Sequence, residues 1–387
     1  MRLTIVTSFF LPVPPIRGGS TEKIWSRLAS EFVAAGHEVT FVSRRWPDLA
    51  TQEIVDGVNH LRLRGATHHR SLAVNLWHDA WWGFRVARHL PAADFVICNT
   101  VTLPAWLRWI KRSAGRVVAV IGRMPKGHGR AYGNVDLLLA VSDAVSRKLR
   151  AENPRLEHRI RLFPCPIDWH LHAEAGARRS ATLPRRTPST LVIGYVGRIH
   201  PEKGLDLLLA AATRLVGRPD LPPWRVELVG PWAIPDGGGG DGYRDALERK
   251  FGAALGDRLS FVGPEFNAAA LANRYARFDV FCYPSIAEAG ETFGVSVAEA
   301  MATGCSTLVS ALPCFRELVR PEENGLIFDH SGADAVDRLA GTLIRLLSDA
   351  VLRDRLAARA QAHVRQYDYG ECARRLLSDF EQIVRPS

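Results

Sequence analysis

The sequence predicts an α/β protein made of two doubly wound, Rossmann-like domains that face each other across a cleft. Short apolar runs rich in β-branched residues alternate with longer helical patterns, which is typical of βαβ units around parallel sheets. This alternation occurs twice along the 387 residues, with a polar stretch between the two series. At roughly 100–200 residues per domain, the chain is long enough for two domains, each with its own core.

The first series begins at the start of the chain. The run LTIVT (residues 3–7) predicts a buried strand. After a loop rich in proline and glycine, the stretch STEKIWSRLASEFVAAG predicts a helix with one apolar face. Further strands of this domain are expected at residues 39–43, 95–98, 117–121 and 137–141.

A polar segment at residues 169–188 predicts an interdomain linker, because it is irregular and contains RRSATLPRR. The first domain is therefore expected to cover residues 1–168, and a second series of strands and helices follows the linker. Ligands of doubly wound sheets bind at the carboxyl ends of the strands, so the loops after the strands are the candidate sites. The expected strands of the second domain are residues 191–197, 225–230, 259–263, 280–285 and 306–310.

The charge of the chain narrows the range of partners. Fifty Lys and Arg against 40 Asp and Glu give a formal net charge of +10. Such a balance favours an anionic partner, namely a nucleotide diphosphate, an acidic lipid surface or nucleic acid, although genomic compositional bias would produce the same surplus. No helix-turn-helix, zinc-finger or RNA-binding aromatic motif is found, so we expect no nucleic-acid partner.

The cysteines and the hydropathy pattern bear on the cellular compartment. The six cysteines are scattered and form no C-x-x-C pair, so we expect reduced thiols in a cytoplasmic protein. No window approaches the roughly 20 apolar residues of a membrane-spanning helix. The protein is therefore expected to be soluble, or at most to lie against a membrane.

Two stretches mix tryptophan with basic residues, at 77–88 and 106–112. Trp77, Trp81 and Phe84 fall on one face of a predicted helix, which favours ordinary packing in the core. The alternative is an interfacial patch that brings the protein to a lipid acceptor.

The strongest motif is PSIAEAGETFGVSVAEAMATG, residues 284–304. A strand ends at residue 283, and a helix is expected to begin near Phe293 or Gly294. Gly290 and Gly294 let the backbone approach a ligand, and the helix N-terminus offers unpaired N–H groups. Glu291 and Glu299 lie about two helical turns apart, so they can serve two parts of one elongated ligand. Each carboxylate can accept two hydroxyl donors, as in a sugar or a ribose diol.

A second motif, GYVGRIHPEKG at residues 194–204, directly follows the first strand of the second domain. Arg198 and Lys203 flank a tight turn in which two cations can converge on one diphosphate. In the first domain, Gly18 and Gly19 follow the first strand and could lie against a phosphate or an acceptor. The run Gly237–Gly240 lacks a phosphate-binding frame, so it predicts a flexible surface loop.

No D-x-D sequence occurs in the chain, so there is no evident carboxylate pair for a divalent ion that would bridge a diphosphate. We therefore expect no metal and no other cofactor. Arg198 and Lys203 would neutralise the leaving group instead.

These motifs together resemble the family-four retaining glycosyltransferases, which have the GT-B fold. The resemblance covers nearly the full chain and rests on the E-x7-E pair, the G-R-x4-K motif, GGSTEKIWSRLASEFVAAGHEVTFVS and FRELVRPEENGLIF. It implies that Arg198 and Lys203 hold the diphosphate of a nucleotide-sugar donor and act in catalysis with Glu291. Backbone N–H groups near Phe293 and Gly294 would help Glu291 to hold the transferred sugar, and Glu299 would hold the ribose. It further implies that residues 366–387, approximately, return to the first domain, which leaves 169–365 as the donor-binding domain.

One departure from the family pattern concerns the acceptor side. Family members commonly carry a histidine after the strand that corresponds to residues 117–121, but this chain continues Gly122-Arg123-Met124-Pro125. Arg123, Lys126 or His128 would then take over part of that role at the acceptor.

The opening segment also looks similar to the enzymes that glycosylate 2-deoxystreptamine in aminoglycoside antibiotic biosynthesis. This likeness implies a UDP-sugar donor, transfer of a glucosyl or N-acetylglucosaminyl group, and a small polar acceptor such as an aminocyclitol. Two alternatives remain at this stage. One is a peripheral-membrane transferase with a lipid or polysaccharide acceptor, and the other is a non-catalytic protein that binds a nucleotide sugar.

Overall fold

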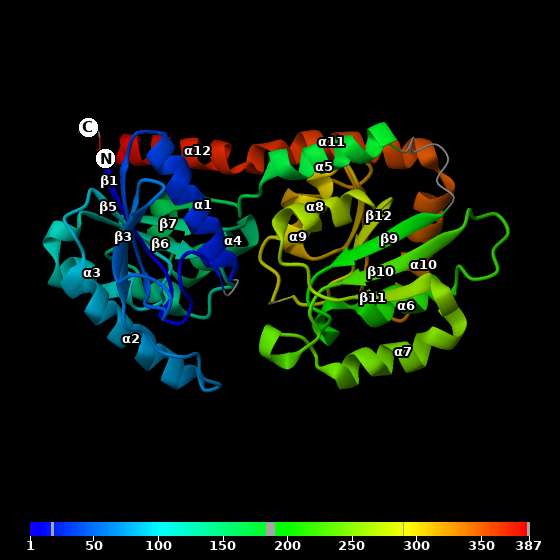
Figure 1. The fold of residues 1–387 in the computed structure, drawn as a ribbon, viewed down its shortest axis with the longest axis horizontal. Coiled ribbons are helices and arrows are strands. Elements are labelled where there is room, and N and C mark those ends of the chain that lie inside the picture. The colour runs from blue at the N-terminus through cyan, green and yellow to red at the C-terminus, as the bar shows by residue number, and fades with distance from the viewer. Residues whose placement is uncertain (17–18, 183–189, 289, 385–387) are drawn as a thin grey trace. The chain divides into compact units, whose positions relative to one another are not determined.

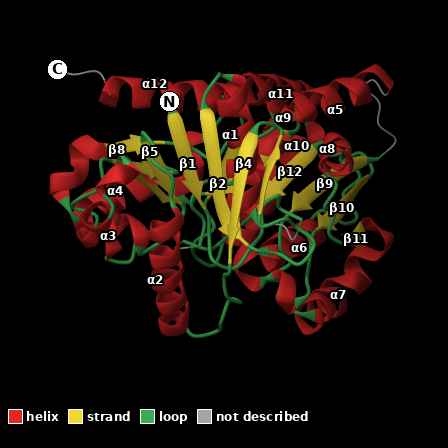
Figure 2. Ribbon diagram, turned by 60° about the vertical axis from the view of Figure 1, so that its left-hand side comes forward, coloured by secondary structure: helices red, strands yellow, loops and turns green. Residues whose placement is uncertain are grey.

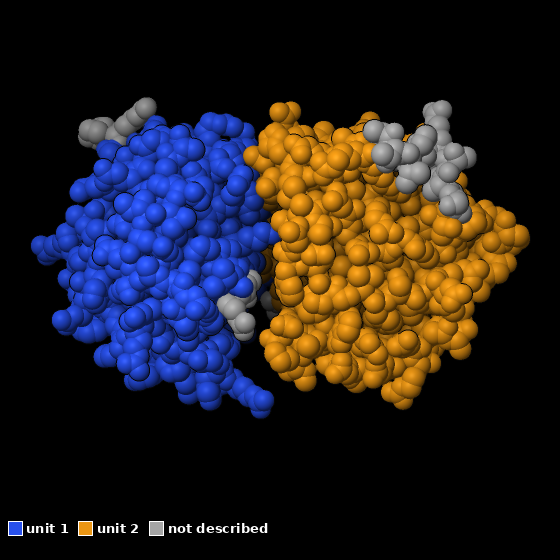
Figure 3. Space-filling model, viewed as in Figure 1, with its two compact units in different colours: residues 1–166, 369–387 blue, residues 167–368 orange. Residues whose placement is uncertain are grey.

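The computed structural model describes residues 1–16, 19–182, 190–288 and 290–384, which fold into two compact units (Figure 1). Unit 1 comprises Met1–Pro166 and Tyr369–Ser387, and unit 2 comprises Ile167–Asp368 (Figure 3). From the sequence, these divisions are expected after residue 168 and near residue 366. Unit 2 is therefore inserted between two segments of unit 1.

Unit 1 contains, within its described residues, an eight-stranded sheet of order β3-β4-β2-β1-β5-β6-β7-β8. Neighbouring strands pair in parallel except β3, which runs antiparallel to β4. The strand order reverses between β1 and β5, as in other doubly wound sheets. The strands are β1 (Arg2–Val6), β2 (Glu38–Arg44), β3 (Gln52–Val55), β4 (Val58–Leu63), β5 (Phe95–Cys98), β6 (Arg116–Ile121), β7 (Leu137–Ala140) and β8 (Ile160–Leu162).

Helices cover both faces of this sheet (Figure 2). One apolar cluster packs α1 and α12 against one face, and a second packs α2, α3 and α4 against the other. Trp25, Phe32 and Phe380 are among the large side chains of the first cluster, and Trp82 is the largest of the second. The helices are α1 (Ser20–Ala34), α2 (Leu72–His89), α3 (Leu103–Ile110), α4 (Asp143–Glu152) and α12 (Tyr369–Val384).

Unit 2 contains a parallel sheet of order β11-β10-β9-β12-β13-β14 in its described part. Here the strand order reverses between β9 and β12. The strands are β9 (Leu191–Val196), β10 (Trp224–Val229), β11 (Leu259–Val262), β12 (Val280–Tyr283), β13 (Ser306–Ser310) and β14 (Leu326–Phe328). The helices are α5 (Trp169–Thr182), α6 (Leu205–Thr213), α7 (Asp241–Leu255), α8 (Ala268–Ala276), α9 (Val295–Ala302), α10 (Ala335–Ser348) and α11 (Ala350–Val364). The predicted α/β class with two doubly wound sheets is confirmed.

The expected linker at residues 169–188 is wrong over its first part, which forms α5 and packs on α8 and α9. Ala175 is buried between these helices, and a Cβ at Gly176 would lie 2.1 Å from the carbonyl oxygen of Thr303. The guanidinium of Arg179 donates to Asp279 at 2.8 Å. A small-residue face therefore makes this polar segment a packed helix. The rest of the expected linker, residues 183–188, lies outside the described part.

The expected core packing of Trp77, Trp81 and Phe84 is also wrong. These side chains on α2 are 65%, 48% and 40% exposed, respectively. The inward face of α2 is formed instead by Trp82, whose indole N–H donates to the carbonyl oxygen of Thr7 at 2.9 Å, and by neighbours such as Val86. The helix thus has an apolar face on each side, and only one of them packs against the sheet.

Candidate functional site

The candidate site lies in unit 2, where the strand order reverses. The loop after β9 carries Arg198 and Lys203, and the loop after β12 carries Glu291. These loops meet because Gly204 has a φ of 66° and its α-carbon lies against the carbonyl of Pro284, where a Cβ would approach within 2.1 Å. The two motifs of the sequence analysis therefore come together at the position where doubly wound sheets bind ligands.

Lys203 and Glu291 form a buried ion pair at this point. The ammonium nitrogen of Lys203 lies 2.5 Å from Oε1 of Glu291, and the two residues are only 5% and 8% exposed. A short turn, Pro201–Lys203, places the lysine just before α6. A buried charge needs a partner, and here each ion satisfies the other.

Oε1 of Glu291 accepts two further hydrogen bonds, from the hydroxyls of Ser285 at 2.9 Å and Tyr283 at 3.1 Å. Burial and the nearby Glu291 charge raise the pKa of Tyr283 well above its usual range, so its phenol remains a donor. All three donors converge on the same oxygen. Within the described residues Oε2 has no hydrogen-bond partner, so one side of the carboxylate can still accept a ligand hydroxyl.

Arg198 lies close by but does not contact Lys203 directly. Its Nη2 donates to Oε1 of Glu202 at 2.6 Å, and the same oxygen is 3.6 Å from the ammonium of Lys203. Although partial burial raises the pKa of Glu202, the charges of Lys203 and Arg198 lower it overall. Glu202 is therefore an anion between the two cations, and this role was not recognised from the sequence.

The run Gly237–Gly240 borders the same place and forms a loop, as expected, but this loop is partly buried. Gly238 and Gly240 are buried. The carbonyl oxygen of Gly237 accepts from Nη1 of Arg198 at 2.7 Å, and the N–H of Gly239 donates to Ile199 at 2.8 Å. The glycines let this loop pack closely against the arginine and fix its direction.

The helix N-terminus predicted near Phe293 or Gly294 is confirmed, since α9 begins at Val295 with Gly294 as its N-cap. Gly294 has a φ of 101°, which only glycine adopts readily. Phe293 is buried and packs edge-on against Tyr367. Gly290 takes part in the turn before Glu291, where its N–H donates to the carbonyl of Ala287 at 3.0 Å.

Glu299 lies within α9 and is 9% exposed. Its Oε2 accepts from the hydroxyl of Tyr275 at 3.0 Å. Burial and the Glu299 charge raise the pKa of Tyr275 well above its usual range. The hydrogen-bond donor of Glu299 is thus different from the three that hold Glu291.

Unit 1 also contains candidate residues, on the loops after β1 and β6. Gly19 is the N-cap of α1 with a φ of 96°, and Gly18 lies outside the described residues. Next to Gly19, the buried Glu22 accepts from the hydroxyl of Ser8 at 2.7 Å, and burial raises its pKa. Glu22 is thus a further polar group at the carboxyl end of β1 that the sequence analysis did not single out.

The suggested acceptor residues follow β6. Arg123 and Lys126 are exposed, and the side chain of His128 lies outside the described part of the chain. Their acceptor role stays a prediction.

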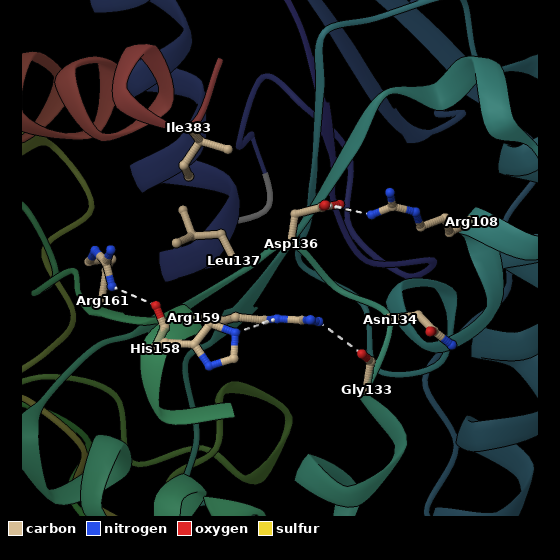
Figure 4. A pocket seen from close by; sticks show the side chains of 9 residues that line it. All are labelled: Arg108, Gly133, Asn134, Asp136, Leu137, His158, Arg159, Arg161 and Ile383. Carbon is tan, nitrogen blue, oxygen red and sulfur yellow. Dashed lines mark hydrogen bonds and ion pairs between the residues drawn. The ribbon is translucent and has the colours of Figure 1, made fainter. Parts of the chain in front are cut away.

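Two adjoining cavities of about 430 and 930 Å³ occur in unit 1, but they lie at the amino ends of the strands. In the smaller one the charged side chains are already engaged (Figure 4). Arg108 pairs with Asp136 at 2.5 Å, and Arg159 donates to the carbonyls of Gly133 and Val135 at 2.8 Å. These arginines hold loops together, so we do not place the functional site here.

Within the described residues, no three His, Cys, Asp or Glu side chains come together as a metal site requires. The described helices also include none that is long and apolar enough to span a bilayer.

Solved structures similar to this chain include a sucrose-phosphate synthase, a glycosyltransferase and a trehalose-6-phosphate synthase. Sucrose-phosphate synthase from Thermosynechococcus elongatus superimposes with a TM-score of 0.77 over 99% of both chains at 21% identity. Anabaena HepE in complex with UDP and glucose gives a TM-score of 0.70 over 99% of this chain and 100% of that chain, at 17% identity. The fold is therefore the GT-B fold of glycosyltransferases.

Sequence similarity adds to this structural likeness. Residues 184–363 match the model of the family described as glycosyl transferases group 1. The phosphatidyl-myo-inositol mannosyltransferase of Mycobacterium tuberculosis strain H37Rv is 31% identical over 211 residues, which are 54% of this chain and 51% of that protein. The D-inositol 3-phosphate glycosyltransferase of Salinispora tropica is 32% identical over 222 residues, or 57% and 44%. The chain thus spans about half the length of these curated relatives, and neither is named for 2-deoxystreptamine.

Proposed function

We propose that this protein is a retaining glycosyltransferase that moves a hexosyl group from a UDP-sugar to a hydroxyl of a cyclitol, with 2-deoxystreptamine as the first candidate acceptor. The observation that carries the proposal is the buried pair of Lys203 and Glu291 at the reversal point of the unit 2 sheet. Arg198 lies in the same loop as Lys203, and Glu299 lies in α9, the helix that follows Glu291. The match of residues 184–363 to group 1 glycosyl transferases supports the reaction class.

The donor's diphosphate is the group that suits the two cations. Arg198 can place two N–H groups on one phosphate, and Lys203 adds a compact charge. Both would offset the negative charge that builds up on the leaving UDP, which is the usual way in which fixed charges accelerate such reactions. Anabaena HepE, which has a similar fold, was solved in complex with UDP and glucose, and this supports a uridine nucleotide in the proposed donor.

The transferred sugar would lie against Glu291 and the start of α9. Oε2 of Glu291 can accept a sugar hydroxyl, because the other oxygen is held by Lys203, Ser285 and Tyr283. The N–H groups at the beginning of α9 favour hydroxyl or anionic oxygens. Glu299 would accept the hydroxyls of the ribose.

In the reaction, the bond between the anomeric carbon and the phosphate oxygen breaks, and the acceptor oxygen bonds to that carbon on the same face. The departing phosphate oxygen takes the proton of the acceptor hydroxyl. The protein supplies position and charge and needs no strong base of its own. We expect no metal requirement, because in this arrangement two side-chain cations would face the leaving group.

The acceptor class rests on chemistry that two independent likenesses share. The relatives are named for phosphatidyl-myo-inositol and D-inositol 3-phosphate. The resemblance to 2-deoxystreptamine enzymes is an expectation from the opening segment of the sequence. Inositol and 2-deoxystreptamine are both six-membered carbocycles with several hydroxyls. A cyclitol ring is therefore the acceptor that we propose.

Mass spectrometry of reaction mixtures tests this function. The purified protein is incubated with UDP- and GDP-sugars, with 2-deoxystreptamine, myo-inositol or myo-inositol phosphate, and with EDTA throughout. A hexosyl or N-acetylhexosaminyl adduct in the wild type, absent in Glu291→Gln, supports the proposal, and the anomeric configuration is read by NMR. Donor binding without turnover of any kind would contradict it and indicate a non-catalytic binding protein.

A further inference from the structure

The positive charge of this protein is concentrated in one part of unit 1. Residues 57–135 contain twelve Arg and Lys but two acidic residues, Asp79 and Asp94, and this surplus of ten equals the formal net charge of the whole chain, +10. Asp79 is buried and accepts hydrogen bonds from Thr102, and Asp94 pairs with Arg2. Neither acid pairs with a basic residue of this segment, although Arg62 and Arg108 pair with Glu53 and Asp136 just outside it.

The same segment exposes an unusual amount of apolar surface on α2. We define the α2 face as the large apolar side chains on the solvent side of this helix, Leu72, Leu76, Trp77, Trp81 and Phe84. Leu72 and Trp77 are 68% and 65% exposed. From Leu72 to Phe84 the face extends for about 18 Å at 1.5 Å per residue. Monomeric proteins rarely leave such a continuous apolar strip in water without a partner.

Basic residues border the α2 face. Figure 2 shows α2 on the outside of the sheet of unit 1. The guanidinium of Arg85 lies 5.3 Å from the ring centre of Trp81, and that of Arg88 lies 5.8 Å from the ring centre of Phe84. Neither arginine has a carboxylate partner among the described residues. Arg70 is exposed just before the helix begins.

We propose that the α2 face docks on an anionic lipid bilayer. Helices that lie in the bilayer interface combine Trp, Phe and Leu on one side with flanking Arg or Lys, and their binding adds apolar burial to attraction by acidic headgroups. Arg85 and Arg88 can reach the headgroups while Trp77, Trp81 and Phe84 enter the boundary of the acyl chains. Each basic residue near an acidic membrane surface contributes roughly 1 kcal/mol.

The positive charge around the α2 face argues against a second copy of the chain as its binding partner. Two α2 faces in contact would bring two surfaces of the same sign together, and like charges oppose such a contact. An acidic membrane surface is complementary to both the charge and the apolar strip. Docking by this face does not depend on the transfer reaction, so the two proposals can be tested separately.

Vesicle sedimentation tests the docking. The full chain, without any donor, is spun with vesicles of phosphatidylcholine alone or of phosphatidylcholine mixed with phosphatidylglycerol. We expect binding to the acidic vesicles only, weakened by salt. The double variant Trp77→Ser/Trp81→Ser should bind at least about tenfold more weakly, since two large apolar side chains leave the interface, and Arg85→Glu/Arg88→Glu should also bind more weakly.

Two controls separate the outcomes. Phe266→Ser removes an 80% exposed apolar side chain from unit 2 and should bind like the wild type. Glu291→Gln should also bind normally, because the site in unit 2 has no part in docking. Wild type that stays in the supernatant, or tryptophan variants that bind as well as the wild type, would overturn the proposal. A concentration-dependent dimer that depends on Trp77 and Trp81, without vesicle binding, would assign the face to self-association instead.

Discussion

The ammonium of Lys203 lies 2.5 Å from a carboxylate oxygen of Glu291, although 88 residues separate the two along the chain. This ion pair joins the loop after β9 to the loop after β12 in the interior of unit 2. It therefore has a structural role besides the proposed catalytic one, and variants must separate these two contributions.

Replacing Lys203 with methionine should abolish at least about 99% of turnover, because a fixed positive charge at the leaving group is lost. The change also leaves the Glu291 carboxylate buried without its ionic partner, which should destabilise the protein by about 3 kcal/mol. Steady-state kinetics and urea unfolding measure the two effects.

The double variant Lys203→Met/Glu291→Gln distinguishes the two contributions. It removes both charges, so most of the lost free energy of unfolding should return while activity stays absent. If activity returned together with stability, the pair would be structural only.

Glu202 should compete with the donor for Arg198 and Lys203. Its carboxylate contacts both cations in the positions that we assign to the diphosphate. Glu202→Gln should therefore bind UDP up to about tenfold more tightly, which corresponds to roughly 1.4 kcal/mol. Isothermal titration calorimetry measures the affinity.

Arg198→Ala is compared with Glu202→Gln in the same measurement of UDP affinity. It should weaken UDP binding and lower turnover by about a hundredfold, with little change in thermal stability because Arg198 is a partly exposed side chain. Normal turnover in Arg198→Ala would refute the diphosphate assignment.

Glu299→Ala should mainly weaken nucleotide binding, because the proposed ribose contact is lost. A loss of two hydrogen bonds to a charged group corresponds to an increase in Kd of about tenfold or more. The control is Tyr275→Phe, which removes the hydroxyl that donates to Glu299 but keeps the carboxylate. Equal affinity for UDP in Glu299→Ala and wild type would rule out the ribose role.

The stability of the protein should fall in mild acid because of His60 in β4. Burial, with the nearby Arg62 charge, lowers the pKa of His60 to about 4 from its usual 6.5. Between these values the unfolded chain binds a proton that the folded protein does not. The neutral His60 therefore causes no loss of stability above about pH 6.5. As the pH falls toward 4, protonation of His60 in the unfolded chain lowers the free energy of unfolding by about 2 to 3 kcal/mol.

Urea unfolding at pH 7 and pH 4.5 checks this pH dependence against His60→Gln. The variant should lose less stability on acidification than the wild type, because it has no imidazole to protonate in the unfolded state. Identical losses in both proteins would show that other groups cause the acid sensitivity.

The two doubly wound sheets could be predicted because strand runs and helical periodicity repeat along the chain. The residues of the candidate site could also be predicted, since Arg198, Lys203, Glu291 and Glu299 lie in motifs of fixed spacing. The contact between Lys203 and Glu291 could not be predicted from the sequence. Only the folded backbone shows that Gly204 lies against Pro284, which brings Lys203 beside Glu291.

Periodicity also could not tell which face of α2 lies inward. The helix carries tryptophan on both sides, so apolar spacing alone is satisfied by either orientation. The buried indole of Trp82 finds an acceptor in the carbonyl of Thr7. This contact between residues far apart in sequence selects the inward face and leaves Trp77 and Trp81 in solvent.

The return of α12 to unit 1 affects the order in which the protein can fold during synthesis. Phe380 of α12 stacks on Phe95 at 4.2 Å between ring centres, inside the core that also contains α1. The whole of unit 2 leaves the ribosome before α12 does, so unit 2 can complete its core first although it lies later in the chain. Multidomain proteins usually fold from the N-terminal domain onward. Here the first unit to be translated is the last to be completed, and its open core must wait for the final helix.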